Sequence, residues 1–184
     1  MSIATAVPAA SSIGTLAKII SGGQTGVDLG ALDAALAAAF PCGGWCPEGR
    51  QSEDGRIPDR YPLVVWPGSG YRQRTYKNVH DSDGTVILFT GSLTGGTKLT
   101  RDLCLKEGKP HVVVDAAQVA VSAAIDAVGS FVLQQGLRIL NVAGPRASGW
   151  GEGHEFAYAV ISGVLNSREL KNESKGWQAY GNEG

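Results

Sequence analysis

The sequence has few cysteines and no long apolar run, and both absences restrict what the protein can be. The three cysteines, Cys42, Cys46 and Cys104, are too few for a disulfide framework, and the spacing Cys42-x-x-x-Cys46 lacks the second ligand pair of a zinc site. No stretch approaches the roughly 20 apolar residues that a membrane-spanning helix needs, and no secretory signal segment is evident. We therefore predict a cytoplasmic protein with buried thiols, no bound metal and no membrane partner.

Net charge and catalytic motifs are scarce as well. The formal net charge of −1 excludes a general affinity for nucleic acid. The sequence contains no nucleophile elbow of the form G-x-S-x-G and no H-E-x-x-H zinc motif, and its three histidines are widely separated. No residue is therefore predicted to be catalytic, and a binding or carrier protein is favoured over an enzyme.

Basic side chains do gather in one segment between positions 50 and 77. The segment contains Arg50, Arg56, Arg60, Arg72, Arg74 and Lys77. These cations would complement an anionic small molecule. The alternative is a solvated loop surface, which we prefer for most of them.

The main feature that is present is a regular alternation of apolar runs. Short runs at 16–20, 63–66, 85–89, 111–114 and 137–142 predict strands, and longer ones at 27–39, 71–81, 97–106, 118–135 and 152–166 predict helices. Continuous apolar strands that alternate with helices are typical of a parallel sheet covered on both faces. The predicted fold is therefore α/β, a Rossmann-like three-layer sandwich with a mostly parallel central sheet flanked by helices.

The same reading predicts one domain with two loose ends. Residues 16–166 form a single Rossmann-like ligand-binding domain, residues 1–15 a frayed N-terminus, and residues 167–184 a polar, flexible tail. Inside the domain, the glycine- and proline-rich segment 41–62 has no periodic pattern. Such a long loop is typical of a functional loop or a lid.

The most informative motif is the glycine-rich turn Ser21–Gly26 between the first predicted strand and helix. Glycines let a ligand approach the backbone, and the first N–H groups of a helix lack internal partners, so phosphate is the usual guest. The alternative is a tight turn in which Thr25 caps the helix and binds nothing. Asp28 in the first turn of that helix would repel a phosphate placed too near.

A second turn, Gly95-Gly96-Thr97, also lies between a predicted strand and a helix. Ligands of such folds bind outside the carboxyl ends of the strands, which brings the turns at 21–26, 90–96 and 143–149 to one edge, with segment 41–62 as a further candidate. Two glycine turns on one edge favour a nucleotide-like ligand. Its phosphate would suit either turn, and the charge of Asp28 beside the first turn favours Gly95–Thr97. Ser82 and Asp83 precede a strand, and they predict either an Asx turn or a hydrogen-bonding patch for the ligand.

Taken together, the motifs resemble one known family. They are Gly22-Gly23-Gln24-Thr25-Gly26-Val27-Asp28, Gly43-Gly44-Trp45-Cys46-Pro47-Glu48-Gly49-Arg50, Ile57-Pro58-Asp59-Arg60-Tyr61-Pro62-Leu63, Asp81-Ser82-Asp83-Gly84-Thr85, Gly95-Gly96-Thr97 and Leu140-Asn141-Val142-Ala143-Gly144-Pro145-Arg146. In this order they resemble the molybdenum cofactor carrier family, a circularly permuted, YpsA-like branch of the Rossmann-like SLOG superfamily. From Ala147 to Gly153 the sequence departs from the family pattern.

The resemblance implies a protein that binds and stores or transfers molybdenum cofactor, a phosphorylated pterin that holds molybdenum through a dithiolene, without chemical turnover. It also implies a homodimer or homotetramer and a molybdoenzyme as acceptor. Together with the turns it assigns ligand binding to Gly22, Gly23, Gln24, Thr25, Gly26, Asp28, Arg74, Ser82, Asp83, Thr90, Gly95, Gly96 and Thr97.

Two alternatives stay open at this point. One is an enzyme that processes a nucleotide derivative, as the phosphoribohydrolase relatives do, and it is motivated by Asp28, Glu48 and Asp83. Those relatives carry a glutamate after their glycine turn, and this sequence has Lys98, Leu99 and Thr100 there instead. The other alternative is a nucleotide-ligand sensor.

Overall fold

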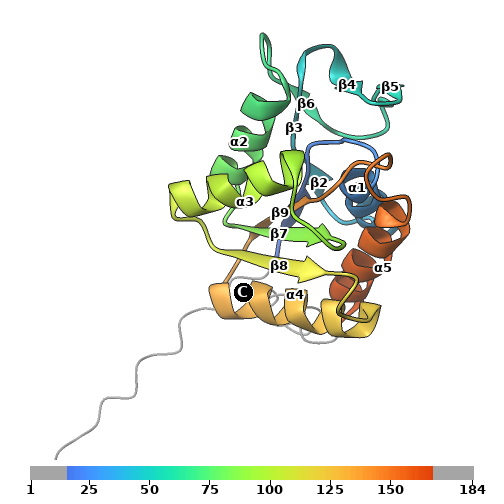
Figure 1. Cartoon of the computed structure of the whole chain (residues 1–184), viewed down its shortest axis with the longest axis vertical. Coiled ribbons are helices and arrows are strands. Elements are labelled where there is room, and N and C mark those ends of the chain that lie inside the picture. The colour runs from blue at the N-terminus through green and yellow to red at the C-terminus, as the bar shows by residue number, and fades with distance from the viewer. Residues whose placement is uncertain (1–15, 168–184) are drawn as a thin grey trace, which may run out of the picture.

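The computed structural model describes residues 16–167. A central parallel sheet lies between two helical layers (Figure 1). The predictions made for residues 1–15 and for the tail from residue 168 onward lie outside the described residues.

The central sheet has five strands in the order β2-β1-β9-β7-β8, and every neighbouring pair is parallel. The strands are β1 (Lys18–Ile20), β2 (Cys42–Gly43), β7 (Gly84–Phe89), β8 (His111–Asp115) and β9 (Ile139–Ala143). Every residue of β7 is buried, which explains its continuous apolar sequence. The predicted α/β class with a parallel sheet is confirmed.

All five predicted helices are present. They are α1 (Val27–Ala37), α2 (Tyr71–Asp81), α3 (Gly95–Glu107), α4 (Val121–Gln135) and α5 (Gly153–Asn166). Helix α4 begins three residues later than predicted, because Asp115 accepts the N–H groups of Ala117 and Gln118 and holds that stretch in a turn.

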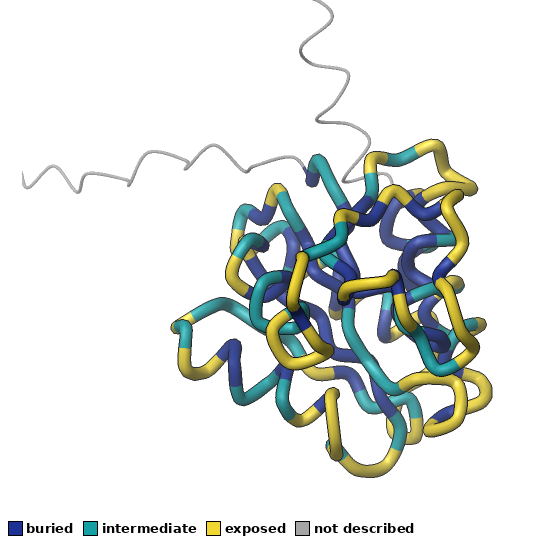
Figure 2. Tube along the Cα trace, turned by 90° about the horizontal axis from the view of Figure 1, so that it is seen from above, coloured by how far each residue is buried: buried dark blue, intermediate teal, exposed yellow. Residues whose placement is uncertain are grey.

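The two faces of the sheet are covered by different helices. Helix α5 packs against α1 and α4, while α2 packs against α3 (Figure 1). The larger core joins the sheet to the first group, and a smaller cluster of Val79, Leu103 and Cys104 lies between α2 and α3. Figure 2 shows the buried segments in the interior and the exposed ones mainly at the periphery. Cys46 and Cys104 are buried and Cys42 is half-buried, and all three are free thiols.

Segment 41–62, which has no periodic pattern in the sequence, contains several short regular elements. It supplies β2 to the central sheet, and it continues through β3 (Trp45–Cys46), the short helix η1 (Glu48–Arg50), β4 (Gln51–Ser52) and β5 (Gly55–Arg56). The predicted strand at 63–66 is β6 (Val64–Val65), which pairs with β3 in a separate two-stranded sheet.

A buried arginine holds this segment together. The Arg50 guanidinium donates to the carbonyl oxygens of Ile57, Pro58, Tyr61 and Leu63 at 2.9–3.1 Å. A small cluster of Leu32, Cys46, Ile57, Tyr61 and Leu63 forms the core beneath it. Arg50 therefore has a structural role and does not contribute to a basic ligand-binding surface.

Candidate functional site

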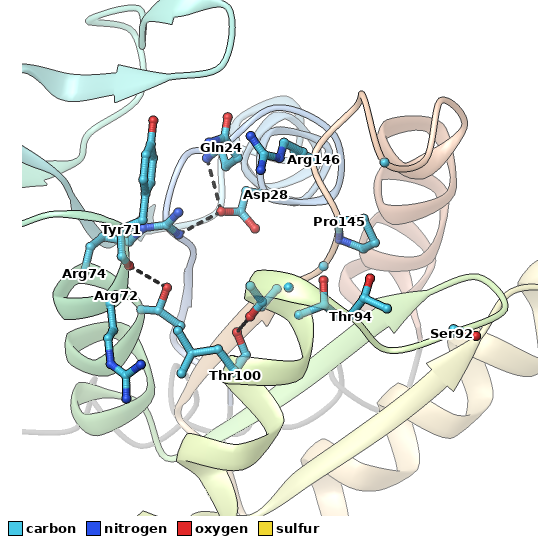
Figure 3. Close-up of a pocket in the computed structure, with 18 of the residues that line it drawn as sticks. Gln24, Asp28, Tyr71, Arg72, Arg74, Ser92, Thr94, Thr100, Pro145 and Arg146 are labelled. Atoms are coloured by element: carbon cyan, nitrogen blue, oxygen red, sulfur yellow. Dashed lines mark hydrogen bonds and ion pairs between the residues drawn. The ribbon is translucent and has the colours of Figure 1, made fainter.

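A cavity of about 500 Å³ opens at the carboxyl ends of β7 and β9 (Figure 3). Its lining comes from the first turn of α1, from α2, from the start of α3, and from the loops after β1, β7 and β9. The residues include Gln24, Asp28, Tyr71, Arg72, Arg74, Thr90, Ser92, Thr94, Gly95, Gly96, Thr97, Thr100, Pro145 and Arg146. The size is that of a small-molecule site, and the position is where sheets of this class bind ligands.

The N-terminus of α3 opens into this cavity. Thr94 is the N-cap residue, and its side chain makes no capping hydrogen bond. A Cβ atom added at Gly95 or Gly96 would meet nothing within 4 Å, so the backbone there faces open space. Gly95 has a φ of +49°, a conformation that favours glycine. Uncapped N–H groups at a helix start form an anion site.

Opposite α3, a buried ion pair forms the wall of the cavity. Arg74 Nη1 lies 3.1 Å from Asp28 Oδ2, and the two side chains are only 11% and 5% exposed. The same Asp28 oxygen accepts the Gln24 N–H at 3.1 Å. Figure 3 shows the pair between Gln24 and Tyr71, and the second Asp28 oxygen carries no dashed contact to the residues drawn.

Burial raises the pKa of the Asp28 carboxyl above its ordinary value, and the Arg74 guanidinium and the Gln24 N–H offset part of that rise. Arg74 Nε is the one buried side-chain nitrogen or oxygen atom within residues 16–167 that has no hydrogen-bond partner. The Tyr71 ring centroid lies 6.0 Å from Arg74 Cζ, and this tyrosine is 47% exposed. The wall therefore combines a buried carboxylate, a guanidinium and an accessible aromatic ring.

Gly22 makes room for this arrangement. A Cβ atom at Gly22 would lie 1.4 Å from Arg74 Nη1. Gly23 has a φ of +75° and packs against Leu63 and Ile57 of the adjoining small core. Gly22 and Gly23 therefore serve close packing within the protein, and neither lines the cavity.

The first glycine turn, the most informative motif of the sequence, is closed by the protein itself. Gln24 N–H donates to Asp28, Thr25 N–H to the Gln24 side chain, and Val27 N–H to the Pro145 carbonyl oxygen. A Cβ atom at Gly26 would lie 2.6 Å from that same oxygen. Of this turn, Gln24 lines the cavity but Thr25 and Gly26 do not.

Glu53 holds the loop after β9 against the first glycine turn. Its carboxylate accepts hydrogen bonds from the Thr25 hydroxyl and from the N–H and hydroxyl of Ser148, and Arg146 Nε lies 3.7 Å from it. Desolvation works to raise the pKa of Glu53, but the hydrogen bonds from Ser148 and Thr25 outweigh it and hold the pKa below its ordinary value. This gives Ala147 and Ser148, where the sequence leaves the family pattern, a role in covering the start of α1.

Ser82 and Asp83 do not belong to this site. The Asp83 carboxylate accepts the N–H groups of Arg138 and Ile139 at 2.9 and 2.7 Å, and the Ser82 hydroxyl donates to the Val79 carbonyl oxygen. Both residues precede β7, so they lie at the amino ends of the strands, at the edge opposite the cavity. The strand therefore separates both residues from the cavity.

Seven of the thirteen predicted residues line the cavity. They are Gln24, Asp28, Arg74, Thr90, Gly95, Gly96 and Thr97. Sequence reasoning missed Tyr71 and Thr100, and it included Arg72 and Arg146 only within longer basic or family motifs. Most of the basic segment pairs elsewhere: Arg56 with Asp59 and Arg60 with Asp33.

Within residues 16–167, no group of three or more His, Cys, Asp or Glu side chains is placed to hold a metal ion. None of the helices in that range is long and apolar enough to cross a membrane.

Comparison with known proteins supports the structural picture. A model of the circularly permutated YpsA SLOG family matches residues 19–165. The structure is similar, with a TM-score of 0.80, to the crystal structure of a "putative molybdenum carrier protein" from Syntrophus aciditrophicus SB. The two sequences are 40% identical over 84% of this chain and 97% of that one. A comparison with curated proteins gives no match.

Proposed function

Because the chain belongs to the circularly permutated YpsA SLOG family, we propose that its cavity binds molybdenum cofactor, a phosphorylated pterin, and that the protein stores or transfers it. The observation that carries the proposal is the contrast between the two glycine turns. The turn before α1 is closed by the protein's own groups, whereas the turn before α3 opens uncapped into the cavity. One anion site in a cavity of ligand size suits a pterin that carries its phosphate at one end.

The phosphate is assigned to the start of α3. Backbone N–H groups at Gly96 and Thr97 and the hydroxyls of Thr94 and Thr97 surround the position, and the helix dipole favours negative charge there. Asp28 lies on the opposite wall, where its charge would not oppose a phosphate at α3.

The pterin is assigned to the Asp28 wall. A pterin carries an amino group and ring N–H donors, and the Asp28 carboxylate is a buried acceptor with one oxygen already fixed by Gln24 and Arg74. Tyr71 supplies an exposed aromatic face on which a planar ring can stack.

The proposal is tested by cofactor retention. Purified protein is mixed anaerobically with cofactor released from a molybdoenzyme and then desalted, and the retained pterin is measured by fluorescence after oxidation. Gly96→Asp is expected to lower retention at least about tenfold, since a carboxylate at the start of α3 would repel the phosphate. The substitution fits, because a Cβ atom at Gly96 meets no other atom within 4 Å.

Gly96→Ala is the matched control, because it adds the same Cβ atom without the charge. We expect it to retain cofactor as the wild type does, and thermal melts of both variants show whether each is folded. Retention by the wild type no greater than that of an unrelated protein would exclude the carrier function. An equal loss of cofactor retention in Gly96→Ala and Gly96→Asp would contradict the placement of the phosphate at the start of α3.

The carboxylates that motivated the enzymatic alternative do not come together in the cavity. Of the three carboxylates that suggested it, only Asp28 lines the cavity. Asp83 binds backbone at the other edge of the sheet, and Glu48 accepts the Gly68 N–H outside the cavity. Transfer to a molybdoenzyme and assembly into a dimer or tetramer stay predictions of the family resemblance, and a cytoplasmic location stays a prediction from the composition.

A further inference from the structure

A second cavity adjoins the first along the same edge of the sheet. It measures about 390 Å³ and is lined by Thr90, Ala116, Val121, Trp150, Glu152, Glu155 and Phe156. Thr90 lines both cavities. Since Thr90 follows β7 and Ala116 follows β8, the second cavity lies at the carboxyl ends of these two strands, between the starts of α4 and α5.

The chemistry of the second cavity differs from that of the first. Its walls are mainly apolar and aromatic, with the Trp150 and Phe156 ring centroids 5.4 Å apart. Two carboxylates, Glu152 and Glu155, lie at the start of α5 and are exposed. Among the described residues that line it there is no lysine or arginine, whereas the first cavity has Arg72, Arg74 and Arg146.

We propose that the second cavity receives a nucleoside, so that the protein binds a pterin phosphate extended by a nucleotide through a pyrophosphate link. This inference rests on the proposed function of the first cavity and names a larger class of ligand for it. The base would lie on the apolar wall of Val121, Trp150 and Phe156. The ribose hydroxyls would donate to Glu152 and Glu155, as ribose hydroxyls do to acidic residues in dinucleotide-binding folds.

The charged groups of the two cavities define the orientation of such a ligand. The pyrophosphate belongs beside the α3 start, between the two cavities, because the segment from Thr90 to Gly96 connects them. Figure 3 shows Ser92 and Thr94 leading away from the Arg74 wall along this segment. The two glutamates would repel phosphates from the second cavity, and a nucleoside carries no charge for them to repel.

The test compares two probes on the same protein. They are the monophosphate form of molybdenum cofactor and its guanine dinucleotide form, both released anaerobically and titrated in the retention assay. We expect the wild type to be half-saturated by the dinucleotide form at a concentration about tenfold lower or less, since stacking of one base on aromatic side chains gives an advantage of that order.

Two valines provide matched variants. Val121 and Val119 are each 36% exposed, but only Val121 lines the second cavity. Val121→Trp would fill the cavity and is expected to remove the preference, so that the two forms are retained alike. Val119→Trp is expected to keep the wild-type preference.

The outcomes separate the two proposals. If the wild type retains both forms equally, or if Val121→Trp and Val119→Trp keep the same preference, the nucleoside site is refuted while the carrier function stands. If the wild type retains neither form, the carrier function fails and the extension fails with it.

Discussion

Removing the guanidinium of Arg74 is the most direct perturbation of the cavity wall. Arg74→Met keeps a long apolar side chain but leaves the Asp28 carboxylate, 5% exposed, without its counter-charge. At 3.1 Å and an effective dielectric constant of about 20, the attraction lost is roughly 5 kcal/mol. Removal of one partner of a buried ion pair typically lowers the free energy of unfolding by about 3–5 kcal/mol. We expect a decrease of that size for Arg74→Met at neutral pH.

The loss should depend on pH in a defined direction. Burial already raises the pKa of Asp28 above its ordinary value of 3.8, and without Arg74 the pKa rises further. A carboxyl with a higher pKa in the folded than in the unfolded state has no effect on stability while it is protonated in both states. Once the pH exceeds the unfolded pKa, the carboxyl ionises in the unfolded chain first, and this favours unfolding. The stability of Arg74→Met should therefore fall as pH rises from about 4 toward the raised folded pKa.

Urea denaturation of ligand-free protein, repeated across this pH range, measures both effects. The double variant Asp28→Asn/Arg74→Met is expected to recover most of the stability at neutral pH, because no charge is left buried. If Arg74→Met costs less than about 1 kcal/mol, or if the double variant is no more stable than Arg74→Met, the ion pair does not have the role assigned to it here.

Three further predictions concern residues outside the cavity wall. Asp83→Ala should lower the free energy of unfolding by about 1–3 kcal/mol, because the N–H groups of Arg138 and Ile139 lose their acceptor. Cofactor retention should not change; reduced retention in a folded variant would return Asp83 to the site. Arg50→Lys should lower the free energy of unfolding by about 3 kcal/mol or more and make the 41–62 segment accessible to limited proteolysis. The reason is that an ammonium cannot reach four carbonyl oxygens as the guanidinium does. A melting temperature equal to that of the wild type would contradict this. Cys46 and Cys104 should react with a thiol reagent only after unfolding, because burial raises the pKa of both thiols and excludes the reagent; rapid labelling of either one in the native protein would show local opening.

Local pattern was sufficient for most of the fold. The periodicity of the apolar runs predicted all five helices and four of the five strands of the parallel sheet. Each of these elements buries enough apolar surface to show a recognisable apolar run in the sequence. Strand β2 is only two residues long, so it leaves no such signal and its pairing with β1 is a tertiary event.

The position of Ser82 and Asp83 relative to the cavity could have been predicted from the sequence itself. Ser82 and Asp83 stand before a predicted strand, whereas the ligand edge of a parallel sheet follows its strands. Their position in the chain therefore already assigns them to the opposite edge, as the bonds from Asp83 to Arg138 and Ile139 show.

By itself, the sequence determined the parallel α/β fold, the edge of the sheet where the cavity lies, and the two glycine turns at that edge. Only the tertiary structure decided which turn is available. The groups that close the first turn, Glu53 and Pro145, come from segments far along the chain, and so does Arg74, which pairs with Asp28. Local sequence shows that backbone N–H groups lack partners within their own helix, but the partners they find elsewhere depend on how distant segments pack.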